Sequence, residues 1–551
     1  MKQKWFRLLL VTGFAAALLP FLFTTAQPSS SSPVPFLVRD IRPTSATNPD
    51  SYAPDSYALT TGYVVNDQLF MGLHVAIYGD EIWRTDGTPE STRIIKETIP
   101  GPDSHRIGPI TLVGNHLYYF IEVNNEFHLW RSDGTNAGTH FVKIVSSATP
   151  SGTILRPYNT ADVNGTFYFE LYGENAELWK SDGTSGGTVL VKPFDAADFD
   201  ILDSFAVFEG QLYFTARDNV AVGSELWRSD GTLAGTQLVK DTIPGPDSGY
   251  PISLTPADDK LYFVTGPNSN LLWRTDGTAA GTTVVKDINP NGTGNVAGLK
   301  FINNILYFRA NDGVTGTEPW ISDGTENGTA RLQDIYPGSG SSSSYSFHLY
   351  NGWVYFIAKD ATHGYELWRT DGTPAGTTLF TDFSPGTAQG PSSIIGVFGS
   401  KLHFIADDGV HGPELWQTDG TVTGTVLVKD INSGIDSPSI GSVGIVGNIF
   451  VFTVNFGVDV QGQELWRSDG TEAGTTLLFD MTPPPAGSDP KALFHSTAYF
   501  TSLPMMEYTA TSCGNLMAQK QVQKWLWSYR QVPQKLFYFR KSSQAPTTSL
   551  F

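Results

Sequence analysis

The chain has 551 residues, of which 40% are hydrophobic and 16% charged, and its formal net charge is −19 at pH 7. Charged residues are fewer than the roughly 25% typical of soluble domains, and 56 Gly and 34 Pro indicate many turns. The negative balance argues against a nucleic-acid partner, because phosphates need a basic surface. The single cysteine, Cys513, excludes an intramolecular disulfide, so packing must stabilise the fold.

The N-terminal residues have the order of a secretory signal peptide. Three basic residues precede an apolar run at 8–23, and small residues follow up to Ala26. This order predicts a signal peptide over residues 1–26, cleaved after Ala26, and a linker over residues 27–36. A membrane anchor is the competing interpretation. We expect a secreted, cell-surface or periplasmic protein with no stable membrane span after cleavage, and its oligomeric state stays open.

The central part of the chain is organised by one motif, a Trp followed three residues later by Asp-Gly-Thr. The motif occurs nine times, and its Trp residues lie 46 to 50 positions apart. A fixed period in this range marks a repeat architecture. The repeated Trp residues are Trp83, Trp130, Trp179, Trp227, Trp273, Trp320, Trp368, Trp416 and Trp466. The repeated Asp residues are Asp86, Asp133, Asp182, Asp230, Asp276, Asp323, Asp371, Asp419 and Asp469.

One module shows four short strands. Segments 394–398, 401–406, 414–418 and 425–430 have apolar or alternating patterns, and turn-forming residues separate them. Four such strands within about 48 residues are typical of one blade of a β-propeller. We therefore predict an all-β propeller of four-stranded blades over residues 37–505. The prediction is one large ring of about nine or ten repeats, and two smaller tandem propellers are the alternative.

We interpret the motif as structural. Asp-Gly favours tight hairpins, because Gly tolerates positive φ and Asp can accept a backbone hydrogen bond. A Trp at one fixed strand position is what packing between blades requires. A calcium site at the turn is an alternative, but one carboxylate falls short of the six to eight oxygens that Ca²⁺ takes. We expect no metal and no cofactor.

Charged residues flank the Trp at fixed positions. A Glu stands two residues before it and a basic residue one after it, as at Glu366 and Arg369. The two side chains point to opposite faces of the strand, which look toward opposite neighbouring blades. We therefore expect contacts between the Arg of one blade and the Glu of the next.

The ends of the chain depart from the repeat. Residues 37–41 match the fourth strand of other modules, and residues 492–503 match a first and a second strand. This pattern predicts that both ends of the chain share a last blade. The segment 506–551 is basic and aromatic, which fits either a divergent blade or an interaction tail.

These modules resemble the bacterial ELWxxDGT repeat family, whose name spells the motif. The stretch Glu225 to Thr232 reads Glu-Leu-Trp-Arg-Ser-Asp-Gly-Thr and fits every fixed position, and the likeness runs from residue 37 to about 482. The resemblance implies an exported or surface protein of bacteria. It attaches no common enzymatic activity to the repeat.

Residues that interrupt the repeat are the candidates for chemistry. Carboxylates and imidazoles stand at similar points of the loops between second and third strands in three successive modules: Asp312, Asp360, His363, Asp407 and His411. Such groups can assemble a metal or an acid–base site, although Asp-Gly and His-Gly pairs also make polar turns. No HExxH pattern occurs.

Two functions follow from these observations. Because the Trp and Asp-Gly-Thr residues recur in every module, they confer no unique activity. We therefore predict a non-catalytic exported propeller that binds a protein or carbohydrate ligand as an adhesion or interaction scaffold. The alternative is a propeller-type hydrolase or lyase that acts on polysaccharide, with its site on the loops between second and third strands.

Overall fold

The computed structural model describes most of the chain between residues 56 and 481. Within this span it leaves out residues 59–61, 76–77, 101–104, 148–153, 174–175, 195–202, 219–220, 266–270, 387–389, 432–438 and 456–462. The predicted signal peptide, the linker, the strand segments 37–41 and 492–503 and the segment 506–551 lie outside the described residues. In the described part, no helix has the length and apolar character needed to cross a membrane.

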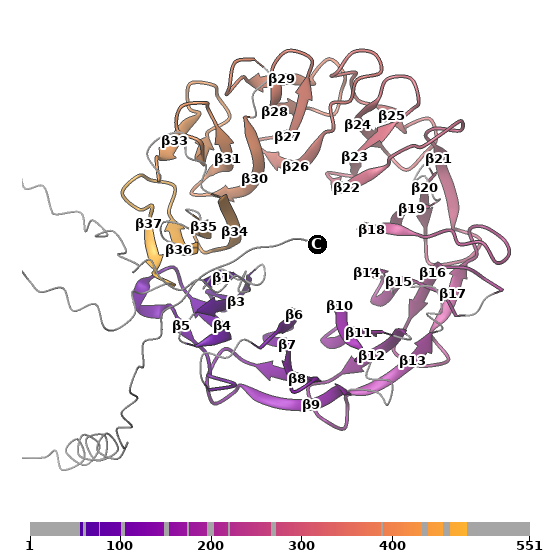
Figure 1. The fold of residues 1–551 in the computed structure, drawn as a ribbon. Helices are drawn as coiled ribbons and strands as arrows, with labels where there is room; N and C mark the ends of the chain where they lie inside the picture. Colours follow the sequence, from indigo (N-terminus) through magenta and orange to yellow (C-terminus); the bar gives the residue numbers. More distant parts are fainter. Residues whose placement is uncertain are drawn as a thin grey trace, which may run out of the picture. The chain divides into compact units, whose positions relative to one another are not determined.

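Nine antiparallel sheets stand side by side in one ring, which is a nine-bladed β-propeller (Figure 1). Each sheet consists of consecutive strands, and eight of the nine have four strands whereas the first has five. The predicted all-β propeller in a single large ring is confirmed, and the alternative of two tandem propellers is wrong. Among the described residues the one helical element is a 3-10 turn, η1 (Pro89–Ser91).

The strands are grouped into blades numbered in chain order. Blade 1 contains β1 (Ser56–Ala58), β2 (Tyr63–Val65), β3 (Gln68–Val75), β4 (Gly79–Thr85) and β5 (Arg93–Ile94). Blade 2 contains β6 (Ile107–Val113), β7 (His116–Val123), β8 (Glu126–Ser132) and β9 (His140–Ser147), and blade 3 contains β10 (Arg156–Val163), β11 (Thr166–Tyr172), β12 (Ala176–Ser181) and β13 (Val189–Phe194). Blade 4 contains β14 (Asp203–Phe208), β15 (Gln211–Ala216), β16 (Glu225–Ser229) and β17 (Gln237–Lys240), and blade 5 contains β18 (Ile252–Ala257), β19 (Lys260–Thr265), β20 (Leu271–Thr275) and β21 (Thr283–Asp287).

The remaining blades repeat the same order. Blade 6 contains β22 (Ala297–Ile302), β23 (Ile305–Asn311), β24 (Thr317–Ser322) and β25 (Ala330–Arg331), and blade 7 contains β26 (Tyr345–Tyr350), β27 (Trp353–Asp360), β28 (Gly364–Thr370) and β29 (Thr378–Thr381). Blade 8 contains β30 (Pro391–Phe398), β31 (Lys401–Asp407), β32 (Pro413–Thr418) and β33 (Val426–Lys429), and blade 9 contains β34 (Ser439–Val446), β35 (Ile449–Asn455), β36 (Gln463–Ser468) and β37 (Thr476–Phe479).

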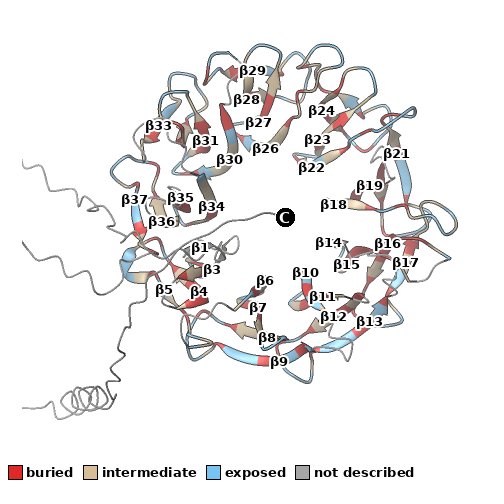
Figure 2. Ribbon diagram, in the orientation of Figure 1, coloured by how far each residue is buried: buried red, intermediate tan, exposed pale blue. Residues whose placement is uncertain are grey.

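The hydrophobic core lies between the blades. The second strand is the most continuously buried, and its central aromatic residue pairs with the repeated Trp, as Phe356 pairs with Trp368 in blade 7. Buried residues therefore follow the inner strands, whereas the outermost strands carry exposed positions (Figure 2). Side chains on both faces of a sheet are thus removed from water, which is the main source of stability for such a fold.

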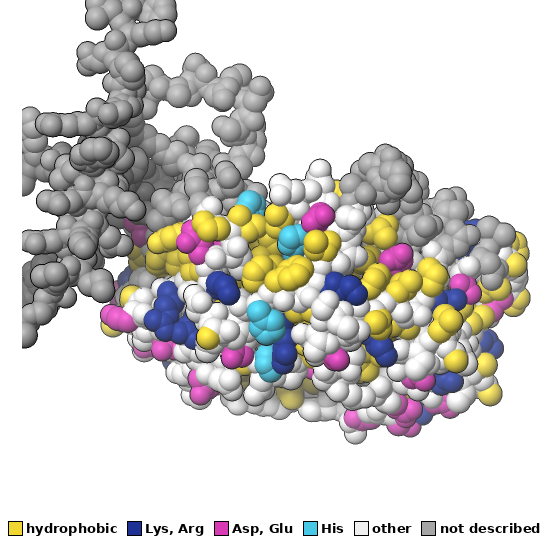
Figure 3. Space-filling model, turned by 90° about the horizontal axis from the view of Figure 1, so that it is seen from below, with side chains coloured by type: hydrophobic (Ala, Val, Ile, Leu, Met, Phe, Trp, Pro, Cys, Tyr) yellow, Lys and Arg dark blue, Asp and Glu magenta, His cyan; other side chains and the backbone are white. Residues whose placement is uncertain are grey.

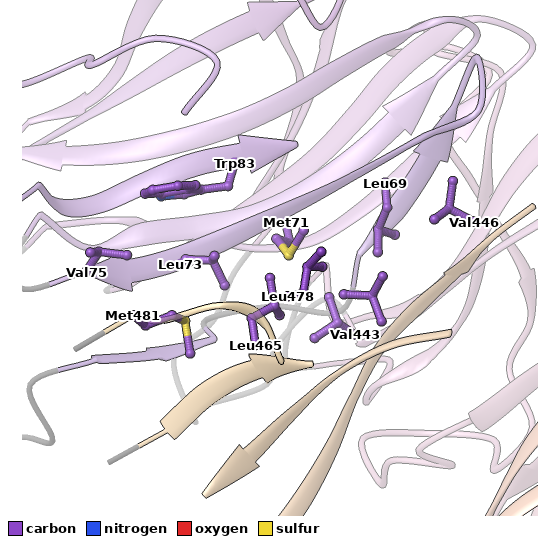
Figure 4. Packing of buried hydrophobic residues seen from close by; sticks show 11 residues of the cluster. Leu69, Met71, Leu73, Val75, Trp83, Val443, Val446, Leu465, Leu478 and Met481 are labelled. Atoms are coloured by element: carbon purple, nitrogen blue, oxygen red, sulfur yellow. The ribbon is translucent and has the colours of Figure 1, made fainter. Parts of the chain in front are cut away.

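The ring is closed by complete blades. Leu69, Met71 and Trp83 of blade 1 pack against Val443 and Leu465 of blade 9 in one buried cluster (Figure 4). Blade 9 takes its fourth strand, β37, from its own module. The described blades therefore close the ring without a strand shared between the two ends of the chain.

The Asp-Gly-Thr turn is held by its own side chains. In blade 4, Asp230 Oδ1 accepts hydrogen bonds from Thr232 N at 2.8 Å and from Thr232 Oγ1 at 2.7 Å. Thr232 Oγ1 in turn accepts from Gly235 N at 2.9 Å. A Cβ atom at position 235 would lie 2.0 Å from Asp230 Oδ1, so a side chain there would require the carboxylate to move. Hydrogen bonds from Thr232 lower the pKa of Asp230 below its usual value.

The outer circumference of the ring carries hydrophobic side chains. Figure 3 looks onto this rim, where hydrophobic and charged side chains alternate over the surface. The exposed hydrophobic residues of the fourth strands are Phe141, Ile144, Val189, Leu190, Val284, Val426 and Leu477. The fourth strands are therefore apolar on both faces, because residues such as Val191 and Leu478 are buried in the core whereas their neighbours are exposed.

Candidate functional site

The nine sheets have two ends with different loops. Because the strands of a sheet are consecutive and antiparallel, the loops between second and third strands emerge at the same end as the crossovers from one blade to the next. We call this end the crossover face. The turns between first and second strands and the Asp-Gly-Thr turns lie at the opposite end. All five predicted site residues therefore belong to the crossover face.

Buried glutamates anchor the crossovers. In blade 7 the Glu366 side chain is 0% exposed, and its carboxylate accepts hydrogen bonds from Phe383 N at 2.8 Å and Ser384 N at 3.4 Å. The equivalent acceptors are Glu81, Glu225, Glu318, Glu414 and Glu464, which bind the amides of Thr98, Thr242, Ile335, Ile431 and Met481. Burial raises the pKa of Glu81 and of Glu366 to about 7.

The predicted Arg–Glu contacts between blades do not form at these positions. The basic residue does reach the next blade, but it binds the backbone: Arg228 Nη1 donates to Gly277 O at 3.1 Å. Arg467 makes the same contact to Gly87 O across the closure. The prediction is wrong in its acceptor, because the glutamate is already engaged by the crossover of its own blade.

In blade 7 the loop between β27 and β28 contains an oriented histidine. Asp360 Oδ1 accepts hydrogen bonds from Thr362 N at 2.8 Å and His363 N at 2.7 Å. Its second oxygen, Oδ2, lies 2.7 Å from His363 Nδ1. The Asp360 side chain is mostly buried, whereas the His363 side chain is 37% exposed. The carboxylate thus fixes the imidazole through Nδ1 and leaves Nε2 as the atom that can meet a ligand.

The two groups of this pair have opposite pKa shifts. Partial burial alone would raise the pKa of Asp360, but hydrogen bonds from His363 and Thr362 outweigh it and lower the pKa. The hydrogen bond to Asp360 raises the pKa of His363 above its usual value, and the nearby Asp382 and Glu366 act in the same direction. The imidazole therefore keeps its proton to a higher pH than a free histidine does.

Blade 8 repeats this arrangement one residue away from the predicted aspartate. His411 Nδ1 lies 2.8 Å from Asp408 Oδ2, and Asp408 Oδ1 accepts from His411 N at 2.9 Å. Asp407 instead accepts from Gly409 N at 2.8 Å and has no part in the pair. The His411 side chain is 36% exposed. The sequence does hold a signal for Asp408, because Asp and His are three residues apart in both loops.

In blade 6 the same loop lacks a histidine. Asp312 Oδ1 accepts from Val314 N at 2.9 Å, and from Thr315 N and Thr315 Oγ1 at 2.8 and 2.9 Å. Asp312 Oδ2 lies 3.5 Å from Arg331 Nη1. Thr315 therefore occupies the position of the histidine, and Asp312 serves as the carboxylate of a polar turn with an ion pair to the outermost strand.

The predicted residues are therefore joined within loops and not between them. Among the described residues no hydrogen bond or ion pair links the loop of one blade to the corresponding loop of the next. No group of three or more His, Cys, Asp or Glu side chains in this part of the chain is arranged to hold a metal ion. A third pair missed in the sequence, His74 and Asp80 at 2.6 Å, is almost inaccessible in blade 1.

The comparisons with known proteins find only weak similarities. The sequence matches no protein-family model, and no curated protein sequence is similar to it. A puromycin hydrolase structure is 15% identical, with a TM-score of 0.34, and the match covers 63% of this chain and 58% of that chain. A structure from a study of two prolyl endopeptidases is 12% identical, with a TM-score of 0.36, covering 73% and 54%. Oligopeptidase B from Leishmania major is 10% identical, with a TM-score of 0.36, covering 64% and 53%.

These comparisons correct the functional prediction. The solved structures just named are described as a puromycin hydrolase and as peptidases, and this chain spans between half and three fifths of their length. The prediction of a non-catalytic binding scaffold is corrected on this finding, and its alternative, a polysaccharide hydrolase or lyase, is carried forward as a proposal. At these identities and TM-scores, neither a substrate nor a catalytic residue of this chain can be inferred from those enzymes.

Proposed function

We propose that the crossover face carries the acid–base site of a hydrolase or lyase that cleaves a polysaccharide. The observation that supports it is the oriented, partly exposed imidazole of His363, held by Asp360 at 2.7 Å. His411 and Asp408 form a second copy in the next blade. A base or acid oriented by a carboxylate is the arrangement on which proton-transfer catalysis depends.

The chemistry requires one proton at the leaving oxygen. In hydrolysis and in elimination alike, the glycosidic C–O bond breaks and the departing oxygen must be protonated. The protonated His363 can donate from Nε2 as the bond breaks. In hydrolysis the neutral imidazole then takes up the proton released by water as the water oxygen bonds to the sugar carbon. In elimination it takes up the proton of the carbon adjacent to the one whose bond breaks, and the double bond forms between these two carbons. Each cycle thus restores the imidazolium, and Asp360 stays ionised and stabilises it.

The raised pKa of His363 suits this role. An acid must be protonated before it can donate, and a histidine with its ordinary pKa of about 6.5 is mostly neutral at pH 7. The hydrogen bond to Asp360 increases the protonated fraction near neutral pH. A backbone-fixed carboxylate also limits the rotation of the ring, which reduces the entropy lost on reaching the reactive geometry.

The test is a cleavage screen over neutral and acidic polysaccharides. Hydrolysis is measured by new reducing ends, and elimination by the ultraviolet absorbance of the unsaturated product. We expect His363→Gln to reduce the rate about 100-fold or more, the usual contribution of a general acid. Asp312→Asn is the matched control, since its turn is of the same kind but contains no histidine. Cleavage that persists in a His363→Gln, His411→Gln double variant would exclude these residues.

We also propose that the protein is exported, as residues 1–26 and the resemblance to the ELWxxDGT repeat proteins imply. An extracellular or periplasmic location fits a polymeric substrate that cannot enter a cell. Mass spectrometry of the mature N-terminus checks this proposal: we expect it to begin at Gln27. A mature protein that retains the apolar run would favour the membrane anchor.

A further inference from the structure

A polar cavity opens on the crossover face at blade 6. Its volume is about 420 Å³, within the range of roughly 300–1,000 Å³ usual for small-ligand pockets. The lining residues are Ile252, Ser253, Asn295, Val296, Ala297, Arg309, Thr317 and Ser343. They come from β18, from the start of β22, from the β23–β24 hairpin and from the crossover to blade 7, and these elements are neighbours in the ring (Figure 1).

The cation of this cavity interrupts the repeat. Arg309 follows Phe308, the partner of Trp320, on the second strand. The corresponding residues of blades 5 and 7 are Val264 and Ile357. Arg309 is half-buried, and within the described part of the chain its side chain has no hydrogen bond, ion pair or ring contact. A guanidinium with no acidic partner in a cavity is suited to receive an anionic group.

The polar side chains beside Arg309 stand on unusual backbone. Ser253, Asn295 and Ser343 have φ values of 57°, 48° and 48°, in the left-handed region that non-glycine residues rarely adopt. Three of the eight lining residues thus share this conformation. The same conformation recurs at equivalent positions of other blades, as at Ser204, Tyr250 and Ser346, so the repeat itself provides it. Here it turns hydroxyl- and amide-bearing residues toward the same cavity as the guanidinium.

We propose that this cavity binds the carboxylate of an acidic sugar unit, with Arg309 as its charge partner and the hydroxyl and amide groups around it as partners for the sugar hydroxyls. A planar carboxylate matches the two parallel N–H donors of a guanidinium. The inference rests on the proposed function, to which it adds the substrate class: a polysaccharide that contains uronic acids. Short oligosaccharides are the ligands for a binding test, because each offers few carboxylates and the net charge of −19 opposes a short ligand less than a long one.

The cavity is connected to the candidate acid. Lys359 N, directly before Asp360, donates to Ser342 O at 3.0 Å, and Ser343 lines the cavity. The hairpin that holds His363 is therefore hydrogen-bonded to the crossover that forms the cavity wall.

Isothermal titration calorimetry of the full mature chain tests the site with a galacturonic acid trimer, its methyl ester and a sulfated oligosaccharide of similar length. We expect binding of the trimer that falls about tenfold or more for the ester and for Arg309→Gln, the loss expected for one charge-assisted contact. Arg309→Lys should retain part of the affinity. Lys300→Gln, which removes an exposed charge of the same blade outside the cavity, should retain all of it.

Three results would overturn the inference: no binding of the trimer, equal binding of the ester, or binding unchanged in Arg309→Gln. Preference for the sulfated ligand would also exclude a carboxylate site. The His363→Gln variant separates this inference from the proposed function. If that variant binds the trimer and the parent does not cleave any polymer, only the proposed enzyme fails; if the parent cleaves but Arg309 is irrelevant to binding, only the carboxylate site fails.

Discussion

The buried carboxylate of Glu366 should make the propeller less stable as the pH rises. Its pKa is raised by burial to about 7, against an ordinary value of 4.5. The folded state therefore holds the proton more tightly than the unfolded chain. The stabilisation is complete below pH 4.5 and is lost as the pH rises through about 7. The difference between the two pKa values corresponds to about 3 kcal/mol, of which about 2.5 kcal/mol is lost between about pH 5 and about pH 8.

Glu366→Gln removes this titration and keeps the shape of the side chain. One oxygen remains to accept from Phe383 N, whereas the longer 3.4 Å hydrogen bond from Ser384 N is lost. That loss costs about 0.5–1.5 kcal/mol at every pH. We therefore expect the variant to be less stable than the parent at about pH 5 and more stable by about 1–2 kcal/mol at about pH 8.

Urea unfolding of parent and variant at both pH values measures the effect. Glu81→Gln is the matched second case, because burial raises the pKa of Glu81 to about 7 as well. The two sites lie in blades 7 and 1, so their effects should add. A stability difference between Glu366→Gln and the parent that is the same at both pH values would refute the reasoning.

Four further outcomes are expected. Gly235→Ala should lower the free energy of unfolding by about 1–3 kcal/mol, because its methyl group would lie 2.0 Å from a carboxylate oxygen; an unchanged melting temperature would contradict the packing. Replacing Arg467 by Met, at the contact between blades 9 and 1, should lower the free energy of unfolding by about 1–3 kcal/mol, because a backbone carbonyl loses its donor. Arg228→Met should cost the same at the contact between blades 4 and 5, and unequal losses in urea unfolding would contradict the equivalence of the two contacts. Burial lowers the pKa of His403 to about 4, so the free energy of unfolding falls as the pH decreases from about 6.5 to 4. His403→Tyr has no such titration, so urea unfolding at acid pH should show a loss of stability smaller by about 3 kcal/mol than in the parent. Cleavage should decline as the pH rises through the raised pKa of His363, and a rate that only increases with pH would exclude it as the acid.

The repeat could be predicted because its signals are local. The Asp-Gly-Thr turn depends on residues within six positions, as in the network from Asp230 to Gly235, and the four-strand pattern depends on alternation and turns. Both are visible in one module. The number of modules then predicts the number of blades. Because the modules follow one another without a linker, a single ring is predicted.

Contacts between segments far apart could not be predicted in the same way. Period two places Glu366 and Arg369 on opposite faces, but it does not say which acceptor each face meets. The structure brings the amide of Phe383 to Glu366 and the carbonyl of Gly420 to Arg369. These backbone partners belong to loops whose conformation cannot be predicted from the pattern of side chains along the strands. In blade 8 the predicted site residues are Asp407 and His411, whereas the carboxylate that contacts His411 belongs to the adjacent Asp408.

Chemistry is most readily sought where one module differs from the other eight. Arg309 interrupts a second strand in which neighbouring blades have Val264 and Ile357, and it meets a cavity. Glu170 occupies the same strand position in blade 3, where it is buried and accepts a hydrogen bond from Asn159 at 3.0 Å. One charged substitution is therefore bonded within its blade, whereas the other faces a ligand-sized space. Since the two cannot be distinguished from the sequence pattern, the distinction between a structural and a binding charge comes from the neighbours that the ring assembles around each.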